Sequence, residues 1–452
     1  MELYSENDSY KLYHGNMLDM DKAIENWTID SIVTDPPYEL NFMGKGWDNS
    51  WIAFRKDTWE KCLKALKPWG YLLAFGGSRT YHRIACAIED AGFEIRDCIM
   101  WLYGSGFPKS MNIEKSINKI DWVEFKSKPA SWVWFMNTDN DWYHNTINQL
   151  EQVWESSKRA KQRAWWGTAL KPSYEPIIVA RKPLEWSCTD NVIKYGVGGI
   201  NIDECRVGNE VISIHNAPAG TFAGWEYDRG SDTESYRDSV GRFPANTILT
   251  YWEEDKEEVC GGFPITKWGG KTKEKWKFWI CFWEWERDSK PMADWYEDEW
   301  SAARYFYCAK ASKRDRDEWC AELEDWLLRR MRPDKDDSNP TWLNKEWRFA
   351  PVVRKNTHPT VKPTDLMQYL VRLVTPNGGT VLDPFNWSGS TGKAVMYENK
   401  DRNKNYKYIW IELTEEYLPI AKARIEYVIN KGIEIEKEGE KAEWIKEQPL
   451  FS

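Results

Sequence analysis

The chain has 452 residues, 42% of them hydrophobic, and a formal net charge of −9. This length allows two or three domains with a sizeable core. The acidic balance argues against nonspecific nucleic-acid binding, although local basic clusters can still contact phosphates. Three such clusters occur, each of which could also be a solvated face: Lys158, Arg159, Lys161, Arg163 and Lys171; Lys310, Lys313, Arg314 and Arg316; Arg348, Arg354 and Lys355.

The nine cysteines form neither a Cys-x-x-Cys pair nor a Cys/His grouping at metal-ligand spacing. We therefore expect no bound metal and a reducing compartment. No run approaches the roughly 20 apolar residues of a membrane span, and the first residues carry no basic-then-apolar signal. These features predict a cytoplasmic protein with no membrane partner.

Strands and helices alternate over the first hundred residues, which predicts an α/β fold with a doubly wound, mostly parallel sheet. Hydrophobic periodicity gives the elements in chain order. We expect strands at 10–13, 29–34, 71–75 and 94–101, and helices at 17–25, 52–67 and 80–90.

The middle of the chain is less regular. Residues 114–163 are polar and helical in character, and residues 175–180 read as a strand. From about residue 187 many Gly, Ser, Thr and Asp residues indicate long loops. Regular elements then return, with helices expected at 365–374, 391–398 and 414–430 and strands at 380–382 and 406–411.

The tetrapeptide Asp35-Pro36-Pro37-Tyr38 follows the apolar strand at 29–34 and predicts a rigid pocket rim for a planar base with an exocyclic amine. Such an amine is a poor nucleophile because its lone pair is delocalised into the ring. The Asp35 carboxylate and the Pro36 carbonyl could localise that pair by accepting both amine hydrogens, and Tyr38 could stack on the base. Taken alone, the tetrapeptide could also be an ordinary strand-ending turn.

A second strand and turn, at 380–392, reads as a loop for a nucleotide-like cofactor. Two more motifs are His-Pro-Thr-Val-Lys-Pro at 358–363 and Tyr-Ile-Trp-Ile-Glu-Leu at 408–413. With these motifs in this order, the chain resembles the DNA amino-methyltransferases that use S-adenosylmethionine. The resemblance is to the group whose Asp-Pro-Pro-Tyr motif precedes its cofactor motif.

The resemblance implies a circularly permuted, Rossmann-like methyltransferase fold. Residues 1–186 would form the catalytic half, 187–345 an inserted target-recognition region with linkers, and 346–452 the cofactor-binding half. Double-stranded DNA would be the substrate, and the target base would flip out of the duplex to reach Asp35 to Tyr38.

The resemblance also implies a cofactor site. Asp383, Pro384 and Phe385 would cradle the methionine portion of S-adenosylmethionine, and backbone N–H groups at a helix start would bind its carboxylate. Glu412 would accept hydrogen bonds from the ribose hydroxyls. The helix-start residues are Ser388, Gly389, Ser390 and Thr391. The other candidates for cofactor binding are Lys362 and Pro363, which precede a helix, and Asp19, which would lie near the cofactor adenine.

In the resembling family, the cytosine-N4 enzymes more often carry serine at the first motif position. The resemblance therefore implies adenine for a chain with Asp35, and we predict methylation at N6 of adenine. The alternatives are methylation at N4 of cytosine and a catalytically silent DNA-binding relic. The recognition sequence, a homodimer and a restriction-endonuclease partner all remain open.

Thirty tryptophans against twenty-eight glycines is an unusual ratio. Several tryptophans lie at turn or strand positions where the resembling family carries glycine, whereas Trp47 and Trp166 look native. We hypothesise that the gene uses UGA for glycine and that these codons have been read as tryptophan; the alternative is a genuinely tryptophan-rich protein. An indole at 387 would hinder cofactor binding, and the suspect positions are Trp69, Trp165, Trp225, Trp387 and Trp410.

Overall fold

A computed structural model of the chain describes most of residues 1–123, 156–215 and 361–430 and short segments elsewhere. The described residues are 1–40, 50–103, 110–123, 125–127, 132–136, 142–146, 151–153, 156–215, 236–251, 265–268, 298–301, 306–310, 326–328, 352–354 and 361–430. Trp225, His358 and most of the predicted recognition region at 187–345 lie outside them.

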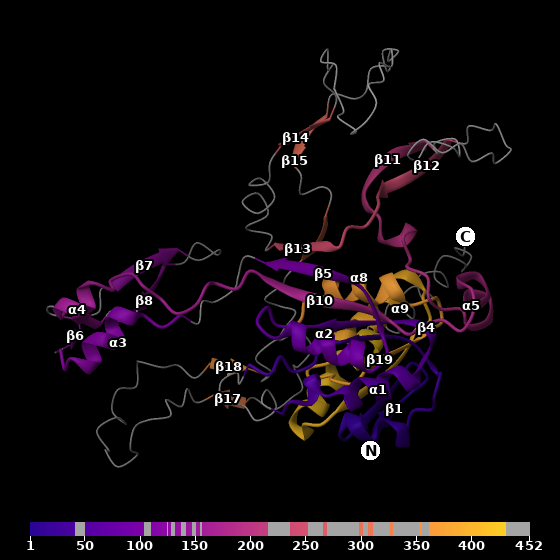
Figure 1. The fold of residues 1–452 in the computed structure, drawn as a ribbon, viewed down its shortest axis with the longest axis horizontal. Coiled ribbons are helices and arrows are strands. Elements are labelled where there is room, and N and C mark those ends of the chain that lie inside the picture. The colour runs from indigo at the N-terminus through magenta and orange to yellow at the C-terminus, as the bar shows by residue number, and fades with distance from the viewer. Residues whose placement is uncertain are drawn as a thin grey trace, which may run out of the picture. The chain divides into compact units, whose positions relative to one another are not determined.

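The main feature is a ten-stranded sheet with the order β1-β2-β20-β19-β3-β4-β10-β5-β13-β16 (Figure 1). Its strands come from both ends of the chain and from the middle. They are β1 (Glu2–Glu6), β2 (Tyr10–His14), β3 (Ile29–Thr34), β4 (Leu66–Phe75), β5 (Glu94–Tyr103), β10 (Tyr174–Arg181), β13 (Thr247–Tyr251), β16 (Tyr307–Lys310), β19 (Thr380–Asp383) and β20 (Lys407–Glu412).

The strands from β2 to β4 in this order are all parallel, whereas β10 is antiparallel to both of its neighbours. From β3 the chain continues to β4 on one side, and from β19 it continues to β20 on the other. The boundary between β3 and β19 is therefore a topological switch point. In open α/β sheets, ligands bind at the carboxyl ends of the strands beside such a point.

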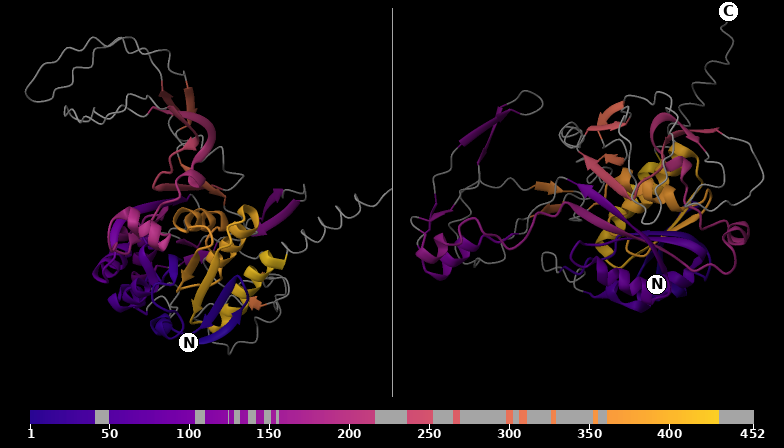
Figure 2. Two further views of the ribbon diagram at one scale, coloured as in Figure 1. Left: turned by 90° about the vertical axis from the view of Figure 1, so that its right-hand side faces the viewer. Right: turned by 45° about the horizontal axis from the view of Figure 1, so that its top comes forward.

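Helices cover both faces of the sheet (Figures 1 and 2). Strand side chains alternate between the faces, so Ile32 packs in one core and Val33 in the other. The face that carries Ile32 is covered by η1 (Met17–Lys22), α1 (Lys56–Ala65) and α2 (Tyr81–Asp90). The face that carries Val33 is covered by α8 (Thr364–Val374), α9 (Ser390–Arg402) and the helical residues 418–430.

The predicted α/β fold with its doubly wound, mostly parallel sheet is confirmed, and most predicted elements lie within a few residues of their expected bounds. Residues 114–163 are not helical throughout, contrary to the expectation from their polar sequence, because four short strands lie between the two helices there. Three other predictions were incomplete. The helix expected at 17–25 is the shorter 3-10 helix η1, β1 was missed, and β13 and β16 arise from a region read as loops. These last two strands owe their structure to parallel pairing beside β5, which local propensity does not reveal.

Contacts divide the chain into two compact units, one made of Met1–Gly104 with Tyr174–Ser452 and the other of Ser105–Ser173. In the second unit α3 (Ile113–Ile120) packs with α4 (Lys158–Lys161). Its described residues also form two short antiparallel pairs: β6 (Phe125–Ser127) with β9 (Glu151–Val153), and β7 (Trp132–Met136) with β8 (Trp142–Thr146).

The first unit has further elements outside the sheet. These are η4 (Ile52–Phe54), α5 (Cys188–Tyr195), η5 (Asp203–Cys205), η9 (Glu415–Tyr417), and the pairs β11 (Val207–His215) with β12 (Tyr236–Arg242), β14 (Ile265–Trp268) with β15 (Asp298–Ser301) and β17 (Trp326–Leu328) with β18 (Val352–Arg354).

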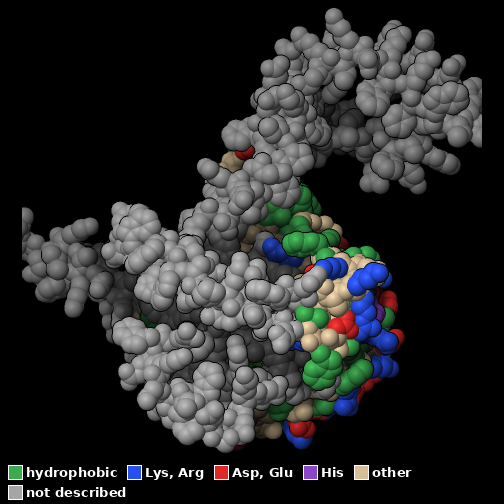
Figure 3. Space-filling model, turned by 90° about the vertical axis from the view of Figure 1, so that its left-hand side faces the viewer, with side chains coloured by type: hydrophobic (Ala, Val, Ile, Leu, Met, Phe, Trp, Pro, Cys, Tyr) green, Lys and Arg blue, Asp and Glu red, His purple; other side chains and the backbone are tan. Residues whose placement is uncertain are grey.

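On the face drawn in Figure 3, Lys and Arg side chains lie interspersed with Asp and Glu side chains. Within the described part of the chain, no helix is long and apolar enough to cross a membrane.

Candidate active site

The two motif-bearing strands lie side by side, which brings Asp35 and Asp383 to the same edge of the sheet. Asp35 follows β3, and Asp383 ends the parallel neighbour β19. Thr34 Oγ1 donates a 2.6 Å hydrogen bond to Asp383 Oδ1, so the strand ends are joined directly. The switch point therefore carries the carboxylates of both motifs.

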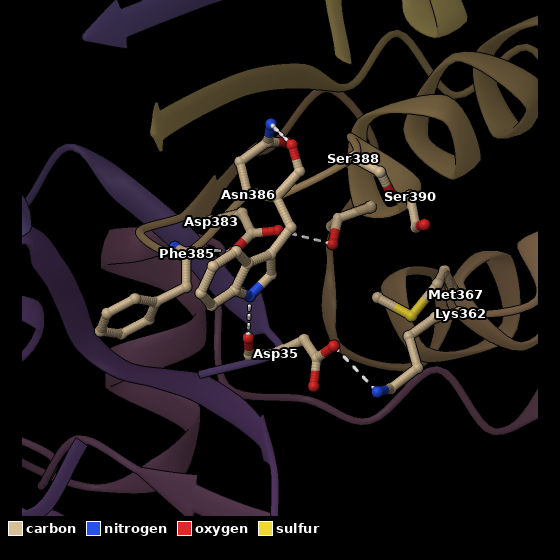
Figure 4. A pocket seen from close by; sticks show the side chains of 10 residues that line it. Asp35, Lys362, Met367, Asp383, Phe385, Asn386, Ser388 and Ser390 are labelled. Carbon is tan, nitrogen blue, oxygen red and sulfur yellow. Dashed lines mark hydrogen bonds and ion pairs between the residues drawn. The ribbon is translucent and has the colours of Figure 1, made fainter. Parts of the chain in front are cut away.

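Asp35 is paired on one side only. Its Oδ2 lies 2.8 Å from Lys362 Nζ (Figure 4). Its Oδ1 is buried and has no hydrogen-bond partner among the described residues. Burial raises the pKa of Asp35, and the Lys362 ammonium opposes that shift. One carboxylate oxygen is thus held by a cation, and the other can accept a further donor.

A second carboxylate, Glu175 at the start of β10, completes a buried ion cluster. Glu175 Oε2 accepts a 2.7 Å hydrogen bond from the Tyr38 hydroxyl and lies 3.3 Å from Lys362 Nζ. Its Oε1 accepts a 3.3 Å hydrogen bond from the Tyr103 hydroxyl. Glu175 therefore links the Tyr38 ring of the first motif to the lysine that contacts Asp35.

The Lys362 ammonium also lies among aromatic rings, 4.9 Å from the Phe75 ring centre and 5.2 Å from that of Tyr38. Burial lowers the pKa of this lysine, but the Asp35 and Glu175 carboxylates outweigh burial and raise it. Burial followed by the same two carboxylates holds the pKa of Tyr38 well above its usual value. Lys362 is accordingly charged and Tyr38 neutral.

Asp383 is a buried acceptor at the centre of the second motif. Its Oδ2 accepts a 2.7 Å hydrogen bond from Thr391 Oγ1, and its Oδ1 accepts one from the Phe385 N–H at 3.1 Å. Burial raises the pKa of Asp383 to about 6, against the opposing effect of these hydrogen bonds. The carboxylate fixes the turn between β19 and α9.

The start of α9 is shaped by a glycine and a buried arginine. Gly389 has a φ of 76°, and a Cβ there would lie 3.0 Å from the Ala421 Cα, so only glycine fits. Arg424 donates to the Ser388 carbonyl at 2.6 Å and reaches Ser390 Oγ at 3.4 Å. Ser388, Ser390 and Thr391 all line one small cavity at this helix start.

Glu412 ends β20 and faces the same turn. Its Oε2 accepts a 2.6 Å hydrogen bond from the Trp387 N–H, and its Oε1 accepts one from the Thr414 N–H at 2.8 Å. Burial raises the pKa of Glu412 to about 7. The side chain is therefore a buried carboxyl group that titrates near neutrality.

The cavity at the switch point has little free space. Its free space is about 10 Å³, roughly what one water molecule needs. Trp387 is one of its walls, and the indole Nε1 donates a 2.6 Å hydrogen bond to the Asp35 carbonyl. This side chain thus spans from the second motif to the first. The lining residues are Asp35, Lys362, Met367, Asp383, Phe385, Asn386, Trp387, Ser388, Ser390 and Thr391 (Figure 4).

Not every predicted site residue lines this cavity. Pro363 caps α8, and the Asp19 carboxylate lies in η1, bonded to Lys22 Nζ at 2.7 Å. Pro36 and Pro37 continue the chain from Asp35, and Pro384 lies between the lining residues Asp383 and Phe385. Tyr38, Gly389 and Glu412 are also not among the lining residues. The roles expected for all of the predicted site residues stay predictions. Sequence reasoning gave Glu175 and Tyr103 no role, and a charged residue opening an apolar strand was the only available signal.

A family model described as DNA methylase, of the N6/N4 methyltransferase type, matches residues 29–423. The chain belongs to this family. The match includes both motif-bearing strands and the Lys362 segment between them. Members of the family use S-adenosylmethionine as methyl donor, as expected from the second motif.

Curated relatives are type II methyltransferases. M.HpaI of Haemophilus parainfluenzae is 27% identical over 163 residues, which is 32% of this chain and 50% of that protein. M2.LlaDCHI of Lactococcus lactis subsp. cremoris is 24% identical over 237 residues, 47% of this chain and 86% of that one. The chain thus spans half the length of the first relative and most of the second.

Solved structures with similarity to the chain include the cytosine-N4-specific PvuII DNA methyltransferase, at 12% identity and a TM-score of 0.40, with 96% of each chain covered. Another is M1.HpyAVI in complex with SAM, at 15% identity and a TM-score of 0.33, with 92% of this chain and 98% of that chain covered.

The donor set around the cavity suits S-adenosylmethionine, but the available space does not. Glu412 offers acceptors for hydroxyl groups, and residues 388–391 form the kind of helix start that binds a carboxylate. Pockets for ligands of this size commonly measure about 300–1,000 Å³. With the Trp387 indole as one wall, the free space is about 10 Å³, far below that range.

Proposed function

We propose that this chain is a DNA methyltransferase that modifies the exocyclic N6 of adenine in double-stranded DNA. The observation that carries the proposal is the buried, unpartnered Asp35 Oδ1 at the carboxyl end of β3. A buried carboxylate oxygen without a hydrogen-bond donor lowers the stability of the fold. Such an oxygen is therefore expected where a bound ligand supplies the donor. The exocyclic amine of a flipped base is such a donor.

In this proposal the residues of the first motif bind and orient the base. Asp35 Oδ1 accepts one amine hydrogen and the Pro36 carbonyl accepts the other, while Pro37 stiffens the rim. Tyr38 offers its ring face for stacking, and its hydroxyl is fixed by Glu175 at 2.7 Å. Because Tyr38 is held at both its hydroxyl and its carbonyl, the latter by Thr80 Oγ1 at 2.7 Å, the ring is preorganised.

Lys362 keeps Asp35 in its acceptor form. An ammonium 2.8 Å from Oδ2 favours the ionised carboxylate in a buried site. The family resemblance implies a cofactor-side role for Lys362, and its contact with Asp35 supports a role on the base-binding side as well. Asp383 and Glu412 would hold S-adenosylmethionine, which would supply an electrophilic sulfonium methyl group.

The remaining assignments extend the proposal. Pro384 and Phe385 border the methionine end of the cofactor, Pro363 positions Lys362, and Asp19 lies toward the adenine end. Residues 1–186 and 346–452 form the two halves of the catalytic domain, and 187–345 supplies target recognition.

The test is transfer of labelled methyl groups from S-adenosylmethionine to unmethylated DNA, followed by digestion to nucleosides. The protein is assayed in the Trp387→Gly form, with Asp35→Ala in that background as the control. We expect label in N6-methyladenine that the Asp35 variant loses. Label in N4-methylcytosine would overturn the choice of base. No transfer by folded protein that still binds DNA would favour the silent relic.

A further inference from the structure

Tryptophan dominates the left-handed backbone positions of this protein. Among the described residues, nine non-glycine residues have positive φ, and six of these are tryptophans. The others are one glutamate and two asparagines, and asparagine tolerates this conformation. The six are Trp27 (62°), Trp51 (60°), Trp69 (70°), Trp122 (54°), Trp165 (68°) and Trp387 (52°).

Burial does not compensate the strain at the most exposed of these positions. Trp122 is 92% exposed and Trp165 is 97% exposed. A bulky L-residue in the left-handed region is unfavourable because its Cβ crowds the following carbonyl. A side chain that gains nothing from packing cannot offset that cost.

Two helix ends within the chain provide a direct comparison. After α2, Gly92 has a φ of 103°; its N–H bonds to the Glu89 carbonyl, and the next N–H bonds to that of Ile88. After α3, Trp122 has a φ of 54°; its N–H bonds to the Lys119 carbonyl, and the next N–H bonds to that of Asn118. Both are Schellman motifs, whose left-handed position is typically glycine.

Other tryptophans behave as ordinary core residues. Trp59 in α1 and Trp101 in β5 have no positive φ. Both are buried, and their indole N–H groups donate to the Ala53 carbonyl at 2.9 Å and to Thr250 Oγ1 at 2.6 Å. By contrast, the buried indole N–H groups of Trp69 and Trp410 have no partner among the described residues. The chain therefore contains two classes of tryptophan.

At position 387 the anomaly falls in the binding site. The backbone is left-handed, the main-chain N–H contacts Glu412, and the indole reaches the Asp35 carbonyl. The side chain thus bridges the turn after β19 and the Asp35 backbone after β3, as one wall of the cavity. Removing it would open the cavity that is otherwise too small for the cofactor.

We infer that glycine is the natural residue at all six left-handed tryptophan positions, encoded by UGA, and that glycine at position 387 opens the S-adenosylmethionine pocket. The last clause rests on the proposed function. Backbone geometry adds Trp27, Trp51 and Trp122 to the positions suspected from sequence. Trp410 has ordinary strand geometry, and its unpartnered indole is its only anomaly.

The first test reads the gene and the protein made by its natural host. We expect UGA at the six positions and UGG at Trp59 and Trp101. Peptide mass spectrometry of the native protein should find glycine at the six positions and tryptophan at the two controls. UGG codons throughout, or tryptophan in the six native peptides, would overturn the inference.

The second test measures S-adenosylmethionine binding by calorimetry to three proteins: the parent with all of its tryptophans, Trp387→Gly and Trp122→Gly. We expect Trp387→Gly to bind at least about 100-fold more tightly than the other two. Trp122→Gly should raise the melting temperature without changing cofactor affinity, since it relieves strain away from the cavity-lining residues. Equal affinity in all three would overturn the claim that the indole closes the pocket.

The two tests separate this inference from the proposed function. Glycine in the native peptides together with no cofactor binding by folded Trp387→Gly would support the recoding and refute the cofactor pocket. Tight cofactor binding by the parent protein would refute the claim that the Trp387 indole closes the pocket. It would leave the proposed methyl transfer intact.

Discussion

At the residue scale, the site depends on charges buried in close contact. Asp35 and Glu175 place two carboxylates around the Lys362 ammonium, at 2.8 and 3.3 Å from its Nζ. Buried charges are tolerated when they are paired and hydrogen-bonded. Removing any one of the three should therefore disturb the other two, and Glu175 offers the clearest test because we do not place it against the base.

Glu175→Gln should weaken the hold on Tyr38 and Lys362 in the Trp387→Gly background. Losing a charged hydrogen-bond partner costs about 1.5–3 kcal/mol, a factor of roughly 10–100 in turnover. We expect kcat to fall by this amount, with little change in the KM for cofactor. The fluorescence of 2-aminopurine at the target base would report disturbed base binding.

Tyr103→Phe is the matched control, because it removes only the longer 3.3 Å hydrogen bond to Glu175. It should lower kcat by less than Glu175→Gln does, and Glu175→Asp should restore part of the loss. If Glu175→Gln left kcat and the fluorescence signal unchanged, Glu175 would have no positioning role.

Asp383 predicts a pH dependence of stability. Burial raises its pKa from 3.8 to about 6, so between these values the folded state holds a proton that the unfolded state has released. This proton stabilises the folded state at low pH, and the stabilisation is lost as pH rises toward 6. The loss in free energy of unfolding is about 3 kcal/mol. The amide of Asp383→Asn cannot ionise, so the stability of this variant should not show this decrease with pH.

Urea unfolding at about pH 4 and about pH 8 measures the effect. The free energy of unfolding should fall by about 3 kcal/mol more over this range in the parent than in Asp383→Asn. Parallel pH profiles for the two proteins would contradict the assignment.

At the element scale, two helices that begin at the cavity are fixed to each other. α8 follows Lys362, and α9 starts at Ser390. Arg372 of α8 forms a bidentate pair with Glu398 of α9, at 2.6 and 3.0 Å, and Glu398 is fully buried. This pair holds the Lys362 segment in register with the cofactor-side helix.

Arg372→Met should destabilise the first unit by about 3–5 kcal/mol, because it leaves the Glu398 carboxylate buried without its main cation. The double variant Arg372→Met with Glu398→Met should regain most of that loss, since two apolar side chains of similar length can replace a buried pair. Urea denaturation measures both. A double variant no more stable than the single one would show that packing, and not the unpaired charge, causes the loss.

At the scale of the whole molecule, the proposed function requires a chain with net charge −9 to contact DNA through local basic surfaces. In the Ser105–Ser173 unit, α4 begins at the exposed residues Lys158 and Arg159. An exposed basic helix of this kind is suited to phosphate contacts, which release counterions on binding.

Lys158→Ala should weaken DNA binding equally for all sequences and reduce the slope of log K against log salt by about 1. Lys56→Ala is the control, because Lys56 is an exposed lysine in α1 that pairs with Glu60 at 3.1 Å. Fluorescence anisotropy at several salt concentrations gives both slopes. A slope unchanged from the parent would remove Lys158 from the DNA contact.

The amino-acid sequence by itself determined the motifs, their order and most of the central strands and helices. β3 and Asp35 were predictable because an apolar strand followed by Asp-Pro-Pro-Tyr is a local signal, and β19 with Asp383 is another. Family, fold class and cofactor follow from these local patterns. The excess of tryptophan was also visible, but not which positions have left-handed backbone.

Only the tertiary structure decided which distant residues meet. Glu175 lies 140 positions from Asp35 and Lys362 lies 327 positions from it, yet all three share one ion cluster. Their meeting depends on strand order, with β10 inserted antiparallel between β4 and β5, and on the packing of α8 against the sheet. Strand pairing and side-chain packing are long-range interactions, which local periodicity does not encode.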